Sequence, residues 1–331
     1  MIDFNQISAE QFTERILQGD VVYLARAITL LESLQKEHQQ KAGIILQNCL
    51  PHSGNSIRVG ITGVPGVGKS TFIEHLGKII ITEGKKLAVL TVDPSSKKNK
   101  GSILGDKTRM ENLAKEKHVF IRPSPAGDTL GGVTNATRES IILLEATGYN
   151  VIFVETVGVG QSETAVYNMT DIFILLMLAG AGDELQGIKR GIMEMADIIC
   201  INKADGGNIE KANHAKRDLK RAIHLFSASE SGWNCIVETC SASHNINLEI
   251  IWEHVLAYEA HTKKNKYFSE KRKQQLLSWF REALQNNFMQ VISANKQLQE
   301  KIIETEKLIF DNTIIPSVAA KNIVIDDLFN K

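Results

Sequence analysis

The stretch from Arg58 to Thr71 constrains the fold more than any other part of this 331-residue chain. A short β-branched run is followed by Gly63-Val-Pro-Gly-Val-Gly68-Lys69-Ser70, which fits the pattern G-x-x-x-x-G-K-[ST], and a helical pattern opens at Thr71. The order strand, glycine loop, helix is the context that this phosphate-binding motif requires. The sequence therefore predicts a P-loop that binds the phosphates of a nucleotide.

Each part of the predicted loop has its own role. The glycines let consecutive backbone N–H groups curve around phosphate oxygens, and the helix N-terminus adds partial positive charge. Lys69 is expected to reach the β- and γ-phosphates, and the Ser70 hydroxyl is expected to bind Mg²⁺. The predicted nucleotide-binding residues of this stretch are Gly63, Val64, Pro65, Gly66, Val67, Gly68, Lys69, Ser70 and Thr71.

Seven short apolar runs alternate with helical patterns through the middle of the chain. The expected strands are 57–62, 87–92, 119–122, 151–155, 172–178, 198–202 and 236–239, and the expected helices are 69–83, 107–117, 134–147, 185–196, 208–226 and 248–261. Continuously apolar strands separated by helices favour an α/β fold, in which a mostly parallel sheet carries helices on both faces. Ligand-binding loops should then lie at the C-terminal ends of the strands.

Helical patterns flank this region on both sides. Residues 1–55 are predicted to form an N-terminal helical region, which a possible capping box at Ser8 and Gln11 begins. Residues 56–261 form the P-loop domain, and residues 262–331 lack the apolar surface to fold alone. That tail should pack on the P-loop domain or on a second copy of it. Its basic run at 263–273 is typical of a solvated helix face.

Two aspartates follow the second strand and are candidate Mg²⁺ ligands. Asp93 comes directly after the strand, and Asp106 lies at the end of a polar loop that contains two glycines. A carboxylate at a strand end can bind Mg²⁺ directly or through water. Asp106 can equally be the N-cap of the expected 107–117 helix. The loop between them suits a switch that orders around γ-phosphate and Mg²⁺.

The fourth strand ends with Glu155, and Gly158 follows three residues later, which is the spacing of a second switch. The carboxylate would sense Mg²⁺, and the glycine N–H would donate to the γ-phosphate. The residue after Gly158 is Val159, where Ras-like proteins have the glutamine that orients water. We therefore expect slow intrinsic hydrolysis that a partner or dimerisation stimulates. The expected catalytic residues are Lys69, Asp93, Asp106 and Glu155, and the expected metal ligands are Ser70, Asp93, Asp106 and Glu155.

The sixth strand ends in Asn202-Lys203-Ala-Asp205, which favours GTP over ATP. A carboxylate at Asp205 can accept hydrogen bonds from the N1–H and N2–H₂ groups of guanine, and adenine offers no such pair of donors. Asn202 can bridge loops, and the Lys203 stem can stack on the base. Ser241 and Ala242, after the seventh strand, lie where a backbone N–H could contact guanine O6.

Composition excludes several other classes of protein. Lys+Arg and Asp+Glu both number 38, so no electrostatic footprint for nucleic acid is present. The longest apolar run, 172–181, is too short to span a bilayer, and the N-terminus has no secretory pattern. Four cysteines without a C-x-x-C pair favour a cytoplasmic protein. Cys49 and His52 could be two metal ligands, but zinc sites normally recruit three or four ligands, so the pattern favours an ordinary linker histidine.

Three longer stretches of the sequence match a known family. They are Arg122-Pro-Ser-Pro-Ala-Gly-Asp-Thr-Leu-Gly-Gly132, Glu155-Thr-Val-Gly-Val-Gly-Gln-Ser-Glu163 and the segment from Ala179 to Glu194. Together with Val92-Asp-Pro-Ser-Ser and Ile103-Leu-Gly-Asp-Lys-Thr-Arg-Met, they resemble the methylmalonyl-CoA mutase-associated GTPases, called MeaB or ArgK in bacteria. The resemblance runs from about residue 20 to 285. It departs from the usual pattern at Lys97-Lys-Asn-Lys and at Ser243-His-Asn-Ile-Asn.

The resemblance implies a homodimeric G-protein chaperone of an adenosylcobalamin-dependent acyl-CoA mutase. Such a protein binds GTP, GDP and Mg²⁺, gates cofactor delivery, and protects or reactivates the mutase. It also implies a third switch at 179–190, with Asp183, Gln186 and Lys189 as mutase contacts, and a C-terminal dimerisation arm. Nothing in the sequence is a recognisable motif for binding cobalamin directly.

Two alternatives remain open. A nickel-type metallochaperone GTPase would share the parallel-sheet architecture, but such proteins carry sites dense in cysteine and histidine, and here only Cys49 and His52 are close in sequence. A kinase would need a catalytic base beside an acceptor pocket, and the residues outside the switches offer no clear candidate.

Overall fold

The computed structural model describes residue 4 and residues 6–92, 110–123, 130–156, 162–180, 190–223 and 229–325. The chain divides into two compact units, Met1–Gln275 and Leu276–Lys331. The first unit contains the sheet, the P-loop and the N-terminal helices. The second contains the C-terminal helices, and each unit is described by itself.

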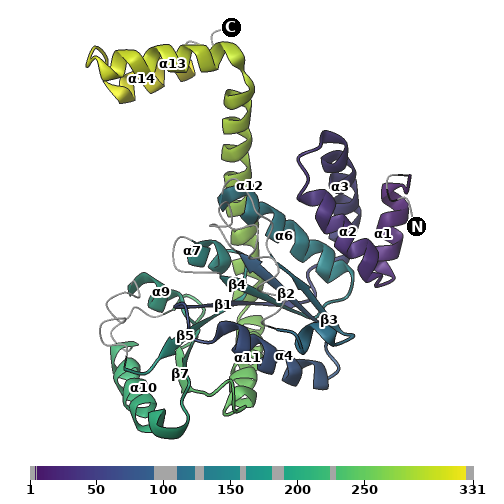
Figure 1. Ribbon diagram of the computed structural model, residues 1–331, viewed down its shortest axis with the longest axis vertical. Coiled ribbons are helices and arrows are strands. Elements are labelled where there is room, and N and C mark those ends of the chain that lie inside the picture. The colour runs from purple at the N-terminus through teal and green to yellow at the C-terminus, as the bar shows by residue number, and fades with distance from the viewer. Residues whose placement is uncertain are drawn as a thin grey trace. The chain divides into compact units, whose positions relative to one another are not determined.

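A seven-stranded sheet forms the centre of the first unit (Figure 1). Its strand order is β3-β2-β4-β1-β5-β6-β7, and every paired neighbour runs parallel. The strands are β1 (Ile57–Gly63), β2 (Leu87–Val92), β3 (Val119–Arg122), β4 (Val151–Thr156), β5 (Ile172–Leu178), β6 (Ile198–Asn202) and β7 (Ile236–Thr239). The predicted strands and the predicted α/β fold are confirmed.

Helices cover both faces of the sheet, and β4 shows how one strand contributes side chains to the core on each face. Val151 and Phe153 join the core under α4 (Lys69–Thr82) and α11 (Leu248–Lys264). Ile152 and Val154, the alternate residues, join the core under α6 (Leu130–Ala146) and α7 (Ser162–Tyr167). Successive side chains of a strand point to opposite faces, so a strand buried on both sides must be apolar throughout. Near β6 and β7, α9 (Arg190–Met195) and α10 (Ile209–Ile223) complete the covering.

The N-terminal helices pack on the α6 side of the sheet. They are α1 (Ala9–Leu17), α2 (Val21–Leu31) and α3 (Lys36–Cys49), followed by the short η1 (Leu50–His52). The Ser8–Gln11 capping box is present, and Asp20 caps α2 after the break at Gly19. Arg122, at the end of β3, forms an ion pair with Glu32 after α2. This pair fixes the N-terminal helices to the edge of the sheet.

The predicted helix at 107–117 is wrong in the part that the structure describes. Residues 110–112 form a turn, and η2 (Leu113–Lys115) is a short 3₁₀ helix. Met110 and Leu113 are buried in the core with α4, and β3 begins soon afterwards at Val119. Tertiary packing and the short distance to the strand therefore end the helical pattern after one turn.

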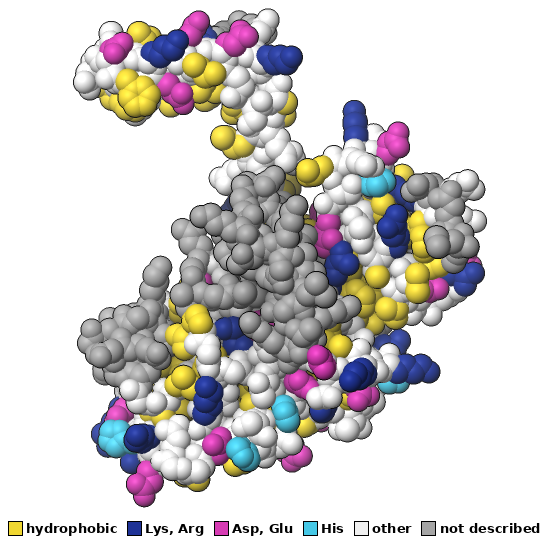
Figure 2. All heavy atoms as spheres, in the orientation of Figure 1, with side chains coloured by type: hydrophobic (Ala, Val, Ile, Leu, Met, Phe, Trp, Pro, Cys, Tyr) yellow, Lys and Arg dark blue, Asp and Glu magenta, His cyan; other side chains and the backbone are white. Residues whose placement is uncertain are grey.

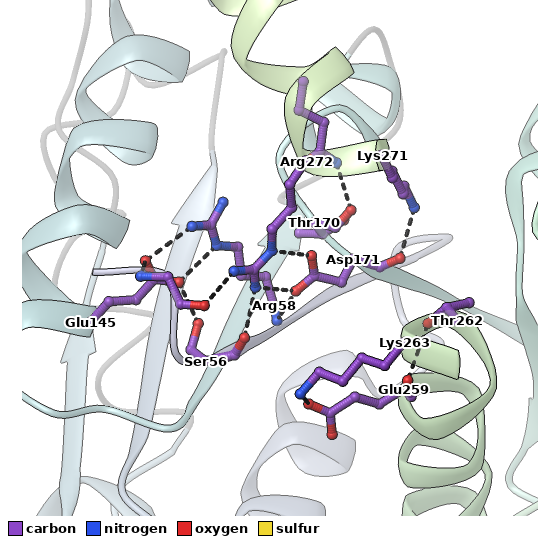
Figure 3. Close-up of polar contacts among 12 residues, drawn as sticks. Ser56, Arg58, Glu145, Thr170, Asp171, Glu259, Thr262, Lys263, Lys271 and Arg272 are labelled. Carbon is purple, nitrogen blue, oxygen red and sulfur yellow. Dashed lines mark hydrogen bonds and ion pairs between the residues drawn. The ribbon is translucent and has the colours of Figure 1, made fainter. Parts of the chain in front are cut away.

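The first residues of α12 (Tyr267–Ala294) belong to the first unit, although the sequence assigned them to the tail. Arg272 forms two hydrogen bonds of 2.7 Å with the Asp171 carboxylate and also donates to the Gly54 and Ser56 carbonyls (Figure 3). Lys271 donates to the backbone carbonyl of Asp171 at 2.7 Å. The basic run is therefore only partly a solvated face, and the boundary of the compact unit lies after Gln275.

The second unit consists of the rest of α12, α13 (Lys296–Phe310) and α14 (Pro316–Asn322). Among residues 276–325, only Leu298 and Ala319 are buried. Hydrophobic side chains are visible along these helices in Figure 2. Within the ranges that the structure describes, no helix is both long and apolar enough to cross a membrane.

Candidate nucleotide-binding site

Close contacts require glycine at two positions of the loop between β1 and α4. Gly63 has a φ of 154°, and a Cβ atom there would lie 2.5 Å from the Leu176 carbonyl oxygen on β5. Gly68 has a φ of 97°, and a Cβ atom there would lie 2.8 Å from Nδ2 of Asn202 on β6. Side chains cannot be accommodated at such distances, so these glycines let the loop lie directly against the ends of two neighbouring strands.

Lys69 is the first residue of α4, and its side chain folds back over the loop. Its Nζ donates to the Gly63 carbonyl at 2.7 Å and lies 3.5 Å from the Val64 carbonyl. The N-cap residue is Gly68, which has no side chain to cap the first N–H groups of the helix. These amides and the Lys69 ammonium group therefore lie together at the N-terminus of α4, where an anion is favoured.

Oxygen-bearing side chains gather where β1 and β4 end. Glu155 is 5% exposed and aligns with Ile61 of β1 on one side and with Thr91 of β2 on the other. The hydroxyls of Thr62 and Thr156 lie 2.8 Å apart. A buried carboxylate at a strand end is an oxygen donor of the kind that Mg²⁺ prefers.

Several predicted site residues lie outside the described residues. They are Asp93 and Asp106 of the first expected switch, Gly158 of the second, and Asp183, Gln186 and Lys189 of the third. Of the predicted metal ligands, the structure describes Ser70 on α4 and Glu155 on β4. Their roles stay predictions.

Asn202 connects the P-loop to the loop after β7. Its Nδ2 donates to the Val67 carbonyl at 2.8 Å, and its Oδ1 accepts the Ala242 N–H at 3.0 Å. The Cys240 thiol lies 3.6 Å from the same Oδ1. Asn202 is 1% exposed, so both halves of its amide are committed to these partners. The bridging that the sequence suggested for this side chain is present.

Lys203 and Asp205 follow Asn202 at the rim of the P-loop. Lys203 has the left-handed φ of 59°, and its Nζ donates to the Gly66 carbonyl at 2.8 Å. Its alkyl stem therefore extends from the end of β6 to the phosphate loop. The Asp205 carboxylate accepts a hydrogen bond from the Ser241 hydroxyl, so it is held at the opening of the loop after β7.

The N–H groups proposed for guanine O6 have partners inside the protein. The Ser241 N–H donates to the Ile246 carbonyl at 3.2 Å, and the Ala242 N–H donates to Asn202. A base oxygen at either amide would have to share it with the present acceptor. The contact between O6 and these two residues stays a prediction.

The base loop, from Ser241 to Asn247, makes contacts that the sequence did not predict. Asn245 and Asn247 have φ values of 55° and 60°. Asn245 also contacts His75 of α4, with Oδ1 and Nδ1 2.6 Å apart. Asparagine is among the few residues that enter the left-handed region readily. The spacing Asn-x-Asn after Ser-Ala was therefore a signal for a tight turn.

The Cys49–His52 pair gains no support as a metal site. Cys49 is fully buried, and burial raises the pKa of its thiol to about 11, which disfavours the thiolate that binds metal. His52 is exposed. Among the residues that the structure describes, no group of three or more histidine, cysteine, aspartate or glutamate side chains could hold a metal ion.

Comparison with known proteins agrees with this geometry. The family model described as "Methylmalonyl Co-A mutase-associated GTPase MeaB" matches residues 24–297. The chain is 47% identical to "Probable GTPase Rv1496" of Mycobacterium tuberculosis, over 92% of this chain and 91% of the relative. It is 40% identical to "GTPase ArgK" of Escherichia coli, with 96% of each chain covered.

A mouse protein and a solved structure complete the comparison. "Methylmalonic aciduria type A homolog, mitochondrial" of Mus musculus is 38% identical, over 94% of this chain and 78% of the mouse protein. The solved structure described as "Crystal structure of LAO/AO transport system kinase" has a TM-score of 0.79 and 34% identity, and the match covers all of both chains. The chain therefore belongs to the family of methylmalonyl-CoA mutase-associated GTPases, MeaB, whose members are P-loop GTPases.

Proposed function

We propose that this GTPase is a chaperone of an adenosylcobalamin-dependent acyl-CoA mutase of the methylmalonyl-CoA mutase type. It would gate the loading of the cofactor, and it would protect and reactivate the mutase. The family description names association with methylmalonyl-CoA mutase, and the name of the mouse relative refers to methylmalonic aciduria. These names support the assignment of a mutase as the partner. The residues of the site support the assignment of GTP as the nucleotide.

One observation carries the nucleotide assignment. Asn202 binds the P-loop through Val67 and the base loop through Ala242, so the groups for phosphate and for base belong to one connected site. The Asp205 carboxylate stands at its rim. A carboxylate there accepts from two guanine donors but has no such pair to meet on adenine, and an unpaired carboxylate penalises the wrong base.

The remaining groups of the site would bind either the phosphates or the metal ion. The amides of the loop and the Lys69 ammonium group bind and orient the β- and γ-phosphates. Ser70, Glu155, Asp93 and Asp106 would hold Mg²⁺, which neutralises charge that develops on the phosphates. The Gly158 N–H would donate to the γ-phosphate. Because Val159 follows Gly158, we expect slow hydrolysis by the protein alone, and stimulation by the mutase or by a second copy.

The third switch would relay the state of the nucleotide to the mutase. Asp183, Gln186 and Lys189 are the proposed contacts, on the segment between β5 and α9. β5 is the neighbour of β1, which ends in the P-loop, so a change at the γ-phosphate has a short route to that segment. The relay requires that the segment differ between the GDP and GTP states.

Copurification tests this function. The tagged protein is mixed with an adenosylcobalamin-dependent acyl-CoA mutase in the presence of GDP or a non-hydrolysable GTP analogue. Co-elution that depends on the nucleotide is the expected result. Failure to co-elute with mutases of this class in both states contradicts the chaperone role, and ATP binding as tight as GTP binding contradicts the nucleotide assignment.

A kinase is the second candidate, because the solved relative with a TM-score of 0.79 is named "LAO/AO transport system kinase". A kinase would transfer the γ-phosphate to an acceptor rather than to water. Recovery of all labelled phosphate in solution supports the GTPase alone, whereas label on an amino acid or protein supports the kinase. A nickel-type metallochaperone would gain support only from tight, stoichiometric binding of Ni²⁺ or Zn²⁺.

We propose further that the second unit is a dimerisation arm. Large hydrophobic side chains are exposed in this unit, including Leu277, Phe280, Phe288, Phe310 and Ile315. Exposed apolar surface on this scale marks an interaction site. A second copy of the chain can cover it symmetrically, as most homo-oligomers do.

A further inference from the structure

His244 stands in the base loop beside the carboxylate that is proposed to recognise guanine. Its Nδ1 lies 3.1 Å from the Ser241 hydroxyl oxygen and 3.5 Å from Oδ2 of Asp205. It also lies 3.1 Å from the Ser243 hydroxyl oxygen. The ring is largely exposed, since 62% of the His244 side chain is accessible, whereas 30% of the Asp205 side chain is.

The three side chains form one hydrogen-bonded chain. A carboxylate only accepts, so the Ser241 hydroxyl donates to Asp205 Oδ2 and its oxygen is left to accept from His244 Nδ1–H. Both contacts on the Asp205 carboxylate fall on Oδ2. This is one of the two oxygens that the paired N1–H and N2–H₂ donors of guanine need.

The charge of the histidine ring therefore acts directly on this carboxylate. Asp205 is the charged group that the described contacts place against His244, and Ser241 and Ser243 are its neutral partners. Lys203 does not offset it there, because its Nζ donates to Gly66. A protonated ring adds a positive charge beside Oδ2 and competes with the donors of the base.

We propose that His244 sets how strongly Asp205 binds guanine and makes that recognition depend on pH. This inference rests on the proposed role of Asp205. A ring without charge leaves the carboxylate charge available to the base. A protonated ring holds Asp205 in place of guanine, and a lower pH favours the protonated form of histidine. His244 acts through Asp205 and is thus a positioning residue.

The test measures the dissociation constants of GDP and of inosine diphosphate at pH 6 and pH 8. Inosine diphosphate carries the same phosphates and N1–H but lacks the 2-amino group, so the ratio of the two constants isolates the hydrogen bond from the 2-amino group to the carboxylate. In the wild type this ratio should favour GDP more strongly at pH 8 than at pH 6, by about two- to fivefold, the size expected for one exposed ion pair. In His244→Gln the ratio should be equal at the two pH values.

A matched control is available on α10. His214 is exposed and pairs with Asp218 at 2.9 Å, so His214→Gln removes a histidine–aspartate pair elsewhere on the surface. This variant should keep the wild-type dependence on pH. An unchanged dependence in His244→Gln would overturn the inference. A wild type that did not prefer GDP to ADP would contradict the proposed guanine site itself, rather than the role of His244 alone.

Discussion

The side-chain amide of Asn202 donates to the Val67 carbonyl at 2.8 Å and thereby joins the end of β6 to the P-loop. Its oxygen accepts from Ala242 at the same time. The phosphate loop and the base loop are far apart in sequence, and one buried side chain sets their separation. In the proposed site, binding of the base and binding of the phosphates would thus be coupled through Asn202.

Replacing Asn202 by alanine should weaken GDP binding by about 10- to 100-fold. Two hydrogen bonds are lost, and the Val67 carbonyl and the Ala242 N–H lose a buried partner, at about 1–3 kcal/mol for such groups. Titration with a fluorescent GDP analogue measures the loss. Asn150→Ala is the control, because Asn150 is exposed and accepts from the Lys86 N–H outside this site. Equal affinities in the two variants would contradict the bridging role.

Replacing Asp205 by asparagine should change the base that the protein prefers from guanine to xanthine. The side-chain amide would place its NH₂ group opposite N1–H or N2–H₂ of guanine, so two donors would face each other. Xanthine instead carries an oxygen at position 2, which can accept a hydrogen bond from this NH₂ group. We expect GDP affinity to fall by at least about 100-fold, because a site built to accept hydrogen bonds from a base rejects that base when the acceptor is replaced by a donor. Competition between GDP and xanthosine diphosphate measures the exchange. A variant that still prefers GDP would remove Asp205 from base recognition.

Local patterns predicted the sheet well and predicted the contacts around it poorly. Seven apolar runs identified the strands because a strand buried on both faces, such as β4, must be apolar at every position. The P-loop and the Asn202–Asp205 motif could be identified because their chemistry depends on local spacing. Lys271 and Arg272 could not, because a basic run on a solvated helix and one that meets Asp171 have the same composition. The partner lies about 100 residues away in sequence.

The base loop illustrates the same limit. The departure from the family pattern at residues 243–247 was visible in the sequence, but its consequence depended on which way His244 turned. Only the fold brings the ring within 3.5 Å of Asp205 and places Asn245 against His75. A pattern thus indicates that a loop is unusual, and the three-dimensional structure shows what the unusual residues contact.

The anchor at the beginning of α12 predicts where the chain can be truncated. A chain that ends at Gln275 keeps Arg272, and a chain that ends at residue 261 leaves the Asp171 carboxylate, only 2% exposed, without its guanidinium partner. Breaking a buried ion pair from one side costs about 3–5 kcal/mol. The chain that ends at Gln275 should therefore unfold cooperatively in urea, and the chain that ends at residue 261 should be much less stable.

A point substitution tests the Arg272 contacts without shortening the chain. Arg272→Met should lower the free energy of unfolding by a similar amount. Lys273→Met is the matched control, since the Lys273 side chain is 70% exposed and pairs with exposed Glu270. It should change stability little. Urea midpoints that are the same for both variants would show that Arg272 contributes no more than a surface charge.

Asp197 should give the protein a stability term that depends on pH. Burial raises the pKa of its carboxyl to about 6, although Lys271 and the Phe173 N–H act in the opposite direction. The native state then binds this proton more tightly than the unfolded chain does, so the term favours folding at pH 4 and is lost as pH rises through about 6. Relative to Asp197→Asn, the wild type should lose up to about 3 kcal/mol between pH 4 and pH 7.

Urea unfolding of both proteins at several pH values measures this difference. The comparison cancels the carboxylates that the two proteins share. The amide introduced by Asp197→Asn would keep an oxygen to accept the Phe173 N–H, which the Asp197 carboxylate accepts at 2.9 Å. Parallel stability curves over this range would show that the Asp197 pKa is the same in the folded and unfolded chains.

The proposed dimerisation arm makes a prediction about mass in solution. Phe280 and Phe310 are 66% and 83% exposed, so the described part of the second unit leaves most of each ring uncovered. If a second copy covers them, the wild type should have the mass of two chains in light scattering. Phe280→Glu and Phe310→Glu together should shift the mass towards one chain, because the dimer would have to bury two unpaired charges in each arm.

The control for this prediction is an equally exposed hydrophobic side chain in the first unit. Leu34 is 89% exposed in the N-terminal helical region, so Leu34→Glu introduces the same charge outside the arm. It should leave the mass unchanged. The arm variant should also keep its GDP affinity, since the P-loop and the base loop belong to the first unit. A wild type with the mass of one chain at micromolar concentration would exclude the dimer, and the exposed phenylalanines would then be surfaces for the mutase.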